Sequence, residues 1–296
     1  MFKPTLHIFG STGALGSALI ASCNTKAWPH KAYSKSGKFG TLPIDLANPK
    51  SLDTISSPKP GDWVVNLAAC SQPAQVFASA STAYEINVKA SEAMCRWARQ
   101  KQCKYLLLSS VEVFDGENAP YTEYSPASPI NEYGRQKVQA ENFVSNFSGD
   151  SSLIVRTSWN ISMTCVGRCL IEVTINSLRT PNARMATDNI FTIASSLETA
   201  NNILSAIEAD QSGLVHIASP KPISRFDLAT HIANSSKSQI FTFDACLFED
   251  LNLREPRGKE NILDTSKSIS SFGAKYSDPY DIVAEKINIL SNRSDS

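Results

Sequence analysis

Short apolar runs alternate with longer amphipathic segments through the first half of the chain. The apolar runs have no regular polar positions, as is typical of strands buried on both faces of a sheet. They predict strands at 5–9, 63–69, 104–110 and 152–159. Between them, apolar positions recur at helical spacing and predict helices at 14–23, 81–101 and 132–147. This alternation predicts an α/β fold with a doubly wound parallel sheet of the Rossmann type.

The alternation becomes less regular after Trp159. Helical patterns follow at 167–179, 197–209 and 223–236, with a strand at 213–219. Ser224 is the expected N-cap of the last helix, and Asp227 lies in its first turn. We therefore expect a first domain over residues 1–158 and a smaller C-terminal lobe over residues 159–290, partly interleaved with the first.

The charge balance excludes several classes of function. Lys and Arg number 28 and Asp and Glu 28, so the basic footprint of a nucleic-acid-binding protein is absent. No apolar run approaches the roughly 20 residues of a membrane span, and the chain start lacks the layout of a signal peptide. We expect a cytoplasmic protein that binds neither nucleic acid nor membrane.

Seven cysteines are scattered along the chain without a CxxC pair, and the four histidines do not cluster with them. Zinc sites need several such ligands at recurring spacings, so no metal site is predicted. We expect the cysteines to pack as small buried hydrophobic side chains. They are Cys23, Cys70, Cys95, Cys103, Cys165, Cys169 and Cys246.

A glycine-rich segment follows the first predicted strand and begins the first helix. Glycines allow the backbone to turn tightly and to approach a pyrophosphate, whose negative charge then lies at the helix N-terminus. The segment predicts a dinucleotide site, with a glycine-rich turn that binds no ligand as the alternative. Its GxxGxxG spacing is typical of the short-chain dehydrogenase/reductase superfamily. The residues are Gly10, Ser11, Thr12, Gly13, Ala14, Leu15 and Gly16.

Residues after the second strand indicate which dinucleotide binds. An acidic side chain about 20 residues past the glycines would bind the ribose of NAD. This region instead carries Ser34, Lys35, Ser36 and Lys38, and hydroxyl and lysine side chains suit a 2′-phosphate. NADP(H) is therefore preferred over NAD(H), with a solvated loop as the alternative. Further nucleotide contacts are expected where later strands end, at Asp45, Leu46, Asn66, Ala68 and Ala69.

Three further motifs follow the glycine segment: NxAA at 66–69, a serine pair at 109–110 and YxxxK at 133–137. This order resembles an extended short-chain dehydrogenase/reductase. The segment SSVEVFDGENAPYTEYSPASPINEYGRQKVQAE, from 109 to 141, more narrowly resembles the dTDP-4-dehydrorhamnose reductase family. RTSW at 156–159 and ILDTSK at 262–267 resemble further landmarks of that family. The resemblance is dense around 109–141 and thin between 160 and 250.

By this resemblance Ser110, Tyr133 and Lys137 are the catalytic residues. Tyrosine has an ordinary pKa of about 10, and a lysine cation one helical turn away favours the phenolate and lowers that pKa. The tyrosine then suits general acid–base catalysis near neutral pH, while Ser110 would stabilise charge on the substrate oxygen. Tyr133 and Lys137 would also contact the cofactor. Asn87 matches a helix asparagine that helps to hold the lysine through a water, with an ordinary polar helix position as the alternative.

Three segments depart from the family pattern. Val111 and Glu112 stand where an Asp-Tyr pair usually follows the catalytic hydroxyl. DNIFTIASS, from 188, lacks the Gly, Pro and Thr of DQ-x-G-x-PT, and CSQPAQVFASAS, from 70, replaces an acidic, histidine-bearing run. The resemblance places these segments at the substrate pocket, so we expect a substrate other than dTDP-4-dehydrorhamnose itself.

The resemblance implies an NADP(H)-dependent oxidoreductase that reduces a keto group on a nucleotide-linked deoxysugar, with Tyr133 as proton donor and residues 159–290 binding substrate. Val111, Glu112 and Trp159 would contact the substrate. Arg254 and Arg257 would pair with its diphosphate, with a solvated basic loop as the alternative.

One rival function is a sugar-nucleotide dehydratase or epimerase. Another is a non-catalytic NADP-binding subunit resembling the β subunit of methionine adenosyltransferase. A homodimer is a possible assembly.

Overall fold

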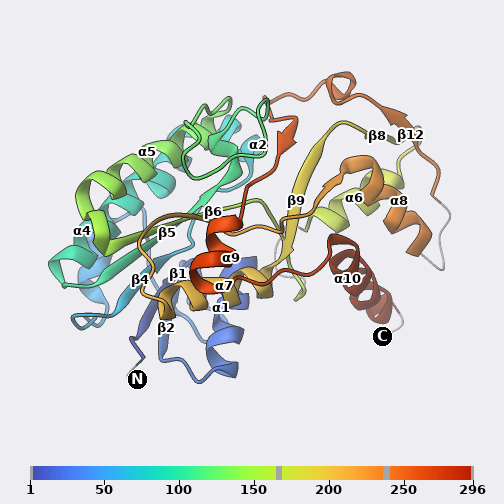
Figure 1. Cartoon of the computed structure of the whole chain (residues 1–296). Coiled ribbons are helices and arrows are strands. Elements are labelled where there is room, and N and C mark those ends of the chain that lie inside the picture. Colours follow the sequence, from blue (N-terminus) through green and yellow to red (C-terminus); the bar gives the residue numbers. More distant parts are fainter. Residues whose placement is uncertain (1–2, 165–168, 236–240, 295–296) are drawn as a thin grey trace.

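Seven parallel strands form the central sheet of the structure, a computed structural model that describes residues 3–164, 169–235 and 241–294 (Figure 1). The strand order is β10-β6-β5-β4-β1-β2-β3, so the chain winds outward from β1 in both directions. Such sheets bind ligands at the carboxyl ends of the strands where the winding reverses, here β1 and β4. The predicted Rossmann-type fold is confirmed. The strands are β1 (Leu6–Phe9), β2 (His30–Ser34), β3 (Leu42–Pro43), β4 (Trp63–Asn66), β5 (Lys104–Ser110), β6 (Ser152–Thr157) and β10 (Gly213–His216).

Successive side chains of the central strands point to opposite faces, and a helical layer covers each face (Figure 1). Leu6 and Val65 pack with α1 and α7, whereas Phe9 and Val64 pack with α4 and α5. Because both faces are covered, the strands carry apolar side chains at nearly every position. The helices of the two layers are α1 (Ala14–Thr25), α7 (Ser196–Glu208), α4 (Ala90–Gln100) and α5 (Glu132–Ser148).

The predicted helix at 81–101 is present, but its backbone is not uniform. After the short helix α2 (Pro73–Ala78), α3 (Ala80–Tyr84) continues through a π-helical turn at Glu85–Lys89 into α4. Asn87 lies in this turn and is fully buried. Such turns are frequent at functional sites, so the irregular backbone indicates a functional role for the contacts of Asn87.

A second group of strands and helices lies beside the central sheet (Figure 1) and encloses a core of its own. The strand β9 is at its centre and pairs with β7, β11 and β13, while β8 pairs with β12. Apolar side chains such as Phe191 and Ile193 of β9 pack against Leu228 and Ile282 of the surrounding helices. The elements are β7 (Trp159–Ile161), β8 (Arg184–Ala186), β9 (Ile190–Ser195), β11 (Pro222–Ser224), β12 (Asp244–Cys246), β13 (Glu260–Asn261), α6 (Leu170–Leu178), α8 (Arg225–Ser235) and α10 (Pro279–Ser294).

Three elements after Trp159 return to the central sheet, one of them α9 (Ser266–Phe272), whose Phe272 packs against the core shared by α1 and α7. The helix α7 packs on the same face as α1, and β10 pairs in parallel with β6. The predicted boundary between two domains at residue 158 therefore stays a prediction. The backbone N of Asp227 donates to the Ser224 hydroxyl at 2.9 Å, which confirms the predicted N-cap of α8. Cys165 and residues 167–168 and 236 of the predicted helices lie outside the described residues.

None of the described helices is long and apolar enough to cross a membrane. Within the same part of the chain, no group of three or more Cys, His, Asp or Glu side chains is placed to hold a metal ion.

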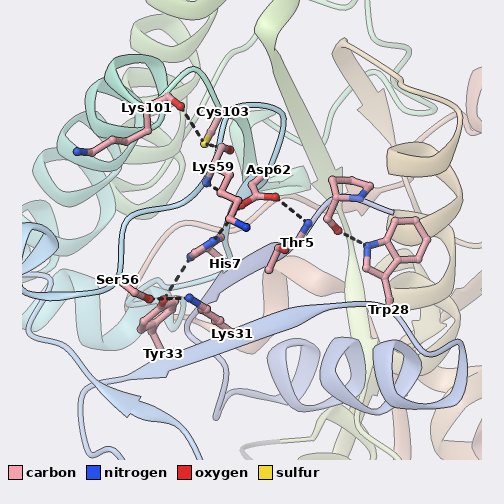
Figure 2. A network of polar contacts seen from close by, with 11 residues as sticks. Thr5, His7, Trp28, Lys31, Tyr33, Ser56, Lys59, Asp62, Lys101 and Cys103 are labelled. Carbon is pink, nitrogen blue, oxygen red and sulfur yellow. Dashed lines mark hydrogen bonds and ion pairs between the residues drawn. The ribbon is translucent and has the colours of Figure 1, made fainter. Parts of the chain in front are cut away.

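A buried polar cluster lies near the amino ends of β1 and β4, away from the glycine segment (Figure 2). His7 Nδ1 is 3.2 Å from the Tyr33 hydroxyl, and His7 Nε2 is 3.6 Å from an Asp62 carboxylate oxygen. Asp62 also accepts hydrogen bonds from the backbone N atoms of Thr5 (2.9 Å) and Lys59 (2.8 Å). Burial lowers the pKa of His7, although the Asp62 carboxylate opposes this shift.

Acid is expected to destabilise the protein through its buried histidines. Burial, with the nearby charge of Arg156, lowers the pKa of His216 to about 3. Below pH 6.5 the unfolded chain therefore takes up a proton at His216 that the folded protein does not. The free energy of unfolding should fall by about 2 kcal/mol between pH 6.5 and pH 5 for this residue alone.

Urea unfolding at pH 7.5 and pH 5 of the wild type and of His216→Asn measures this contribution. Each protein is compared with itself, so the packing change in the variant cancels. The variant should lose less stability on acidification than the wild type. Equal losses would show that His216 takes no part in the acid response.

Candidate active site

The glycine segment forms the turn between β1 and α1. Gly10 has a φ of +79°, and a Cβ atom at this position would lie 2.6 Å from the backbone N of Ala68. Any larger residue is therefore excluded here. Gly13 is the N-cap of α1, no side chain caps this helix, and its first turn has no acidic residue. The positive end of the α1 dipole is thus not compensated by a side chain of its own turn.

A cavity of about 310 Å³, which we call the first cavity, lies along this turn and the carboxyl ends of β4, β5 and β6. The structure brings the glycine turn and the predicted catalytic residues to this one cavity. The predicted site residues that line it are Gly10, Gly13, Ala14, Leu15, Gly16, Ala69, Ser110, Val111, Glu112, Tyr133, Lys137, Trp159 and Arg257.

The helix α5 places Tyr133 and Lys137 on the wall of the first cavity, one turn apart. Lys137 Nζ lies 5.9 Å from the centre of the Tyr133 ring and donates a hydrogen bond to the Leu108 carbonyl oxygen at 2.7 Å. Ser110 is the last residue of β5, and its side chain hydrogen-bonds with Tyr133. A hydroxyl pair and an ammonium group therefore meet at the end of β5.

Burial controls the protonation of this group. Tyr133 is 7% exposed and Lys137 is 2% exposed. Burial raises the pKa of Tyr133 above its usual value, the Glu112 charge adds to this, and the hydrogen bond with Ser110 opposes it. Burial also lowers the pKa of Lys137 to about 8. The pKa of Tyr133 is thus raised by desolvation and not lowered as expected from Lys137, and the phenol stays protonated at neutral pH.

The residues predicted to contact the 2′ position lie beside the first cavity and do not line it. Ser34 ends β2, the strand next to β1, and accepts a hydrogen bond from the backbone N of Gly37 at 3.1 Å. The preceding residue, Tyr33, is tied to the glycine turn, because its carbonyl accepts from the Ser11 hydroxyl at 2.7 Å. Lys35 is exposed on this loop.

Other predicted nucleotide contacts also lie away from the cavity lining. Asp45 is exposed in the turn after β3, where its Oδ1 accepts from the backbone N of Ala47 at 3.2 Å. Leu46 packs half-buried against the core under α4 and α5. Thr12 is half-buried in the glycine turn.

Asn66 turns inward at the end of β4 and does not line the cavity. Its Nδ2 donates to the Ser91 hydroxyl at 3.0 Å and to the Tyr105 hydroxyl at 2.9 Å. Its Oδ1 accepts from the backbone N of Ala68 at 3.1 Å. Asn66 therefore shapes the strand end against which Gly10 packs.

Asn87 contacts the loop after β4 and the helix α5. Its Oδ1 accepts from the backbone N of Cys70 at 2.8 Å, and its Nδ2 donates to the Cys70 carbonyl oxygen and to Gln136 Oε1 at 3.1 and 2.9 Å. No direct hydrogen bond joins it to Lys137 among the described contacts. Its bond to Gln136 holds α5 at the residue before Lys137. Asn87 therefore positions the helix and does not bond the ammonium group directly.

A second cavity of about 330 Å³ adjoins the first and shares Glu112, Trp159 and Arg257 with it. Arg225, the first residue of α8, also lines this second cavity, with its guanidinium 5.0 Å from the centre of the Phe191 ring. Burial and the Arg257 charge lower the pKa of Arg225 to about 10, so the two cations lie within electrostatic reach of each other. Arg225 forms no ion pair with a residue that the structure describes. Two such guanidinium groups suit an anion such as a phosphate.

Sequence reasoning missed Arg225 and selected Arg254 in its place. Arg254 is exposed and lines neither cavity. One sequence signal pointed to Arg225: it directly follows the N-cap Ser224. A cation is unfavourable in the first turn of a helix, so its presence there requires another reason.

Two buried polar atoms at the first cavity, Ser109 Oγ and Asn160 Oδ1, have no hydrogen-bond partner among the described residues. Buried polar atoms are normally bonded, so both indicate a polar ligand. With the uncapped N-terminus of α1, they fit a nicotinamide dinucleotide whose pyrophosphate would lie at the glycine turn. Lys137 would then hold the ribose.

The chain matches the family model of the RmlD substrate binding domain over residues 4–290. It is 26% identical over 223 residues to a dTDP-4-keto-6-deoxy-D-glucose reductase of Streptomyces niveus, which covers 75% of each chain. It is also 33% identical over 141 residues to methionine adenosyltransferase 2 subunit beta of Xenopus tropicalis, which covers 46% of this chain and 41% of that one.

Several solved structures share the fold. A dTDP-4-dehydrorhamnose reductase from Clostridium acetobutylicum has a TM-score of 0.85 at 22% identity, covering 97% of this chain and 99% of that one. The Bacillus anthracis reductase in complex with NADP scores 0.83 at 20% identity, covering 98% and 100%. DesIV, a dTDP-glucose 4,6-dehydratase from Streptomyces venezuelae with NAD and TYD bound, scores 0.82 at 16% identity, covering 98% of each chain.

These relatives confirm the prediction of an oxidoreductase of the short-chain dehydrogenase/reductase superfamily. The match extends over both cores, from the glycine turn to α10. The chain therefore belongs to the RmlD substrate binding domain family, the dTDP-4-dehydrorhamnose reductase family that its motifs resemble.

Proposed function

We propose that this protein reduces a keto group on a nucleotide-linked deoxysugar, with NADPH as cofactor and Tyr133 as proton donor. One observation carries the proposal: the glycine turn and the trio of Ser110, Tyr133 and Lys137 line the same cavity. The bound cofactor would supply the hydride, and the substrate oxygen needs a proton at the same place.

The protonation states of the trio suit reduction. Burial keeps the Tyr133 phenol protonated, so its Oη can donate to the substrate oxygen. Ser110, which hydrogen-bonds with Tyr133, can donate to the same oxygen as negative charge develops there. Lys137 Nζ is mostly charged below its pKa of about 8 and would stabilise the phenolate once the proton has left.

The second cavity supports a nucleotide diphosphate as the carrier of the sugar. Arg225 has no described ion pair, and Arg257 pairs with Glu255 at 2.5 Å while its Nε has no partner among the described residues. Phosphate oxygens would satisfy both cations. Because Arg257 and Trp159 line both cavities, a sugar at their junction would lie beside Tyr133.

A reductase assay over nucleotide-linked ketosugars tests this function. NADPH consumption is followed by absorbance, with dTDP-4-keto-6-deoxyglucose and dTDP-4-dehydrorhamnose in the panel. We expect one NADPH consumed per product. Arg225→Met tests the diphosphate contact: dTDP should bind about 10-fold more weakly to this variant than to the wild type, while the affinity for NADPH is unchanged. A panel without NADPH consumption would refute the proposal.

The cofactor preference is tested at Lys35. Its exposed ammonium lies on the loop that follows Ser34, beside the glycine turn, where a 2′-phosphate would reach it. Lys35→Ala should raise the KM for NADPH about 10-fold and leave that for NADH unchanged. Lys26→Ala, an exposed lysine at the far end of α1, should change neither. Equal effects on both cofactors would contradict a 2′-phosphate contact.

Two other functions have specific support. The buried carboxyl of Glu112 at both cavities could serve a dehydratase or epimerase, and such an enzyme would convert the sugar without net NADPH consumption. The match to methionine adenosyltransferase 2 subunit beta favours a binding protein. That protein would bind NADPH without turnover, but it has no need of Ser110, Tyr133 and Lys137 together.

A further inference from the structure

The side chain of Asn131 joins three separate segments around the candidate active site. Its Oδ1 accepts a hydrogen bond from the backbone N of Gly134 at 2.8 Å. Its Nδ2 donates to Glu112 Oε2 at 2.6 Å and to the Pro256 carbonyl oxygen at 3.2 Å. Asn131 is only 4% exposed, so these bonds form away from solvent and use both polar atoms of the amide.

Each of these segments carries a residue that lines a cavity. The start of α5 carries Tyr133, which lines the first cavity. Glu112 lines both cavities, and so does Arg257, which directly follows Pro256. One amide therefore connects the proposed proton donor with a cation of the proposed diphosphate site.

The backbones of these segments are also in direct contact. A Cβ atom on Gly134 would lie 2.0 Å from the Glu112 carbonyl oxygen. A Cβ atom on Gly116 would lie 2.4 Å from the Cα of Gly258. Because no side chain separates these backbones, a shift of one segment displaces the others.

We propose that Asn131 is a positioning residue that fixes Tyr133 relative to Glu112 and Arg257, so that a diphosphate bound at Arg257 aligns the substrate with the proton donor. This inference rests on the proposed function and deepens it. An N-cap requires only Oδ1. The two bonds donated by Nδ2 exceed what a cap needs, and they carry the positioning role.

Asn131→Asp and Asn131→Ser separate positioning from capping, since both residues are good N-caps that lack the amide donors. We expect kcat to fall about 10-fold in Asn131→Ser, and further in Asn131→Asp, where a second carboxylate faces Glu112. NADPH affinity should stay within about two-fold of the wild type. A residue that only capped α5 would leave kcat unchanged in both variants.

The same two substitutions at Asn48 are the matched control. Asn48 caps the segment Pro49–Thr54 by accepting from the backbone N of Lys50 at 3.2 Å, and it is exposed. Glu112→Gln combined with Asn131→Asp is the rescue, because the new amide can donate to the new carboxylate. The double variant should exceed Asn131→Asp in kcat. No recovery would overturn the role of the Glu112 bond.

Hydrogen exchange in the free protein needs no substrate. Peptides covering 253–260 should exchange faster in both Asn131 variants than in the wild type or the Asn48 variants. Unchanged exchange would overturn the inference, as would unchanged kcat in an active enzyme. A wild type that reduces no ketosugar would instead refute the proposed function, and the exchange result would still test the connection that Asn131 makes.

Discussion

Tyr133→Phe is expected to lower kcat for ketosugar reduction by about 10³-fold, because it removes the only proposed proton donor to the substrate oxygen. The ring stays in place against Val76 and Ala83, so the wall of the first cavity is preserved. NADPH should therefore bind as it does to the wild type. Single-turnover oxidation of bound NADPH, together with fluorescence titration of the cofactor, separates the chemical step from binding.

Tyr33→Phe is the matched control. Tyr33 is as buried as Tyr133, and its hydroxyl contacts His7, away from the first cavity. This variant should reduce substrate at the wild-type rate even if it unfolds more easily. If Tyr133→Phe turned over as fast as the wild type, another group would have to donate the proton, and Glu112 would become the candidate.

Lys137→Met is expected to make the protein less active and more stable. The activity should fall about 10²-fold, because the phenolate left on Tyr133 loses the cation that stabilises it. The stability should rise because Lys137 is 2% exposed and its described hydrogen bond is to the neutral Leu108 carbonyl. The nearby carboxylate of Glu141 is already paired with Arg156 at 3.0 and 2.7 Å.

The sign of the stability change follows from the lowered pKa of Lys137. The folded protein releases this proton near pH 8, whereas the unfolded chain holds it to the ordinary value of 10.5. The buried charge therefore lowers the free energy of unfolding by about 3 kcal/mol below pH 8, and this loss disappears as the pH rises to 10.5. Loss of the Leu108 hydrogen bond offsets part of the gain, so Lys137→Met should be about 1–2 kcal/mol more stable at pH 7.

Urea unfolding at pH 7 and pH 9.5 checks this result. The wild type should gain stability between the two values through this residue, and the variant should not. Lys286→Met is the matched control, since Lys286 is also fully buried but pairs with Glu172 at 3.1 Å. Its removal should not stabilise the protein. A Lys137 variant less stable than the wild type would show that the buried charge is better compensated than its contacts indicate.

Much of the fold was predictable because it depends on neighbours in the chain. The apolar runs of β1, β4, β5 and β6 indicated strands covered on both faces, and each is present. The YxxxK spacing placed Tyr133 and Lys137 on one side of α5, since residues four apart on a helix share a face. Ser224 was predictable as an N-cap because capping involves only the next three residues.

The places of α7 and β10 were not predictable in this way. Their periodicity indicated a helix and a strand, but no residue in these segments indicates which other helix or strand packs against them. In the folded chain α7 packs on the same face as α1, and β10 extends the central sheet beside β6. Strand pairing across such sequence distances is decided by which exposed edge and which apolar face remain free when the elements assemble.

Local chemistry along the chain was sufficient to indicate the family, and it also predicted the glycine turn and the Tyr133–Lys137 pair that line the first cavity, because each is carried by closely spaced residues. Side-chain direction in the assembled protein decided the rest. Asn66 and Asn87 turn inward to hold backbone, and Arg254 remains exposed. Arg225 approaches Arg257 from a position 32 residues earlier in the chain. The sign of the Tyr133 pKa shift also depended on burial, because desolvation is its largest cause and is set by all the surrounding segments.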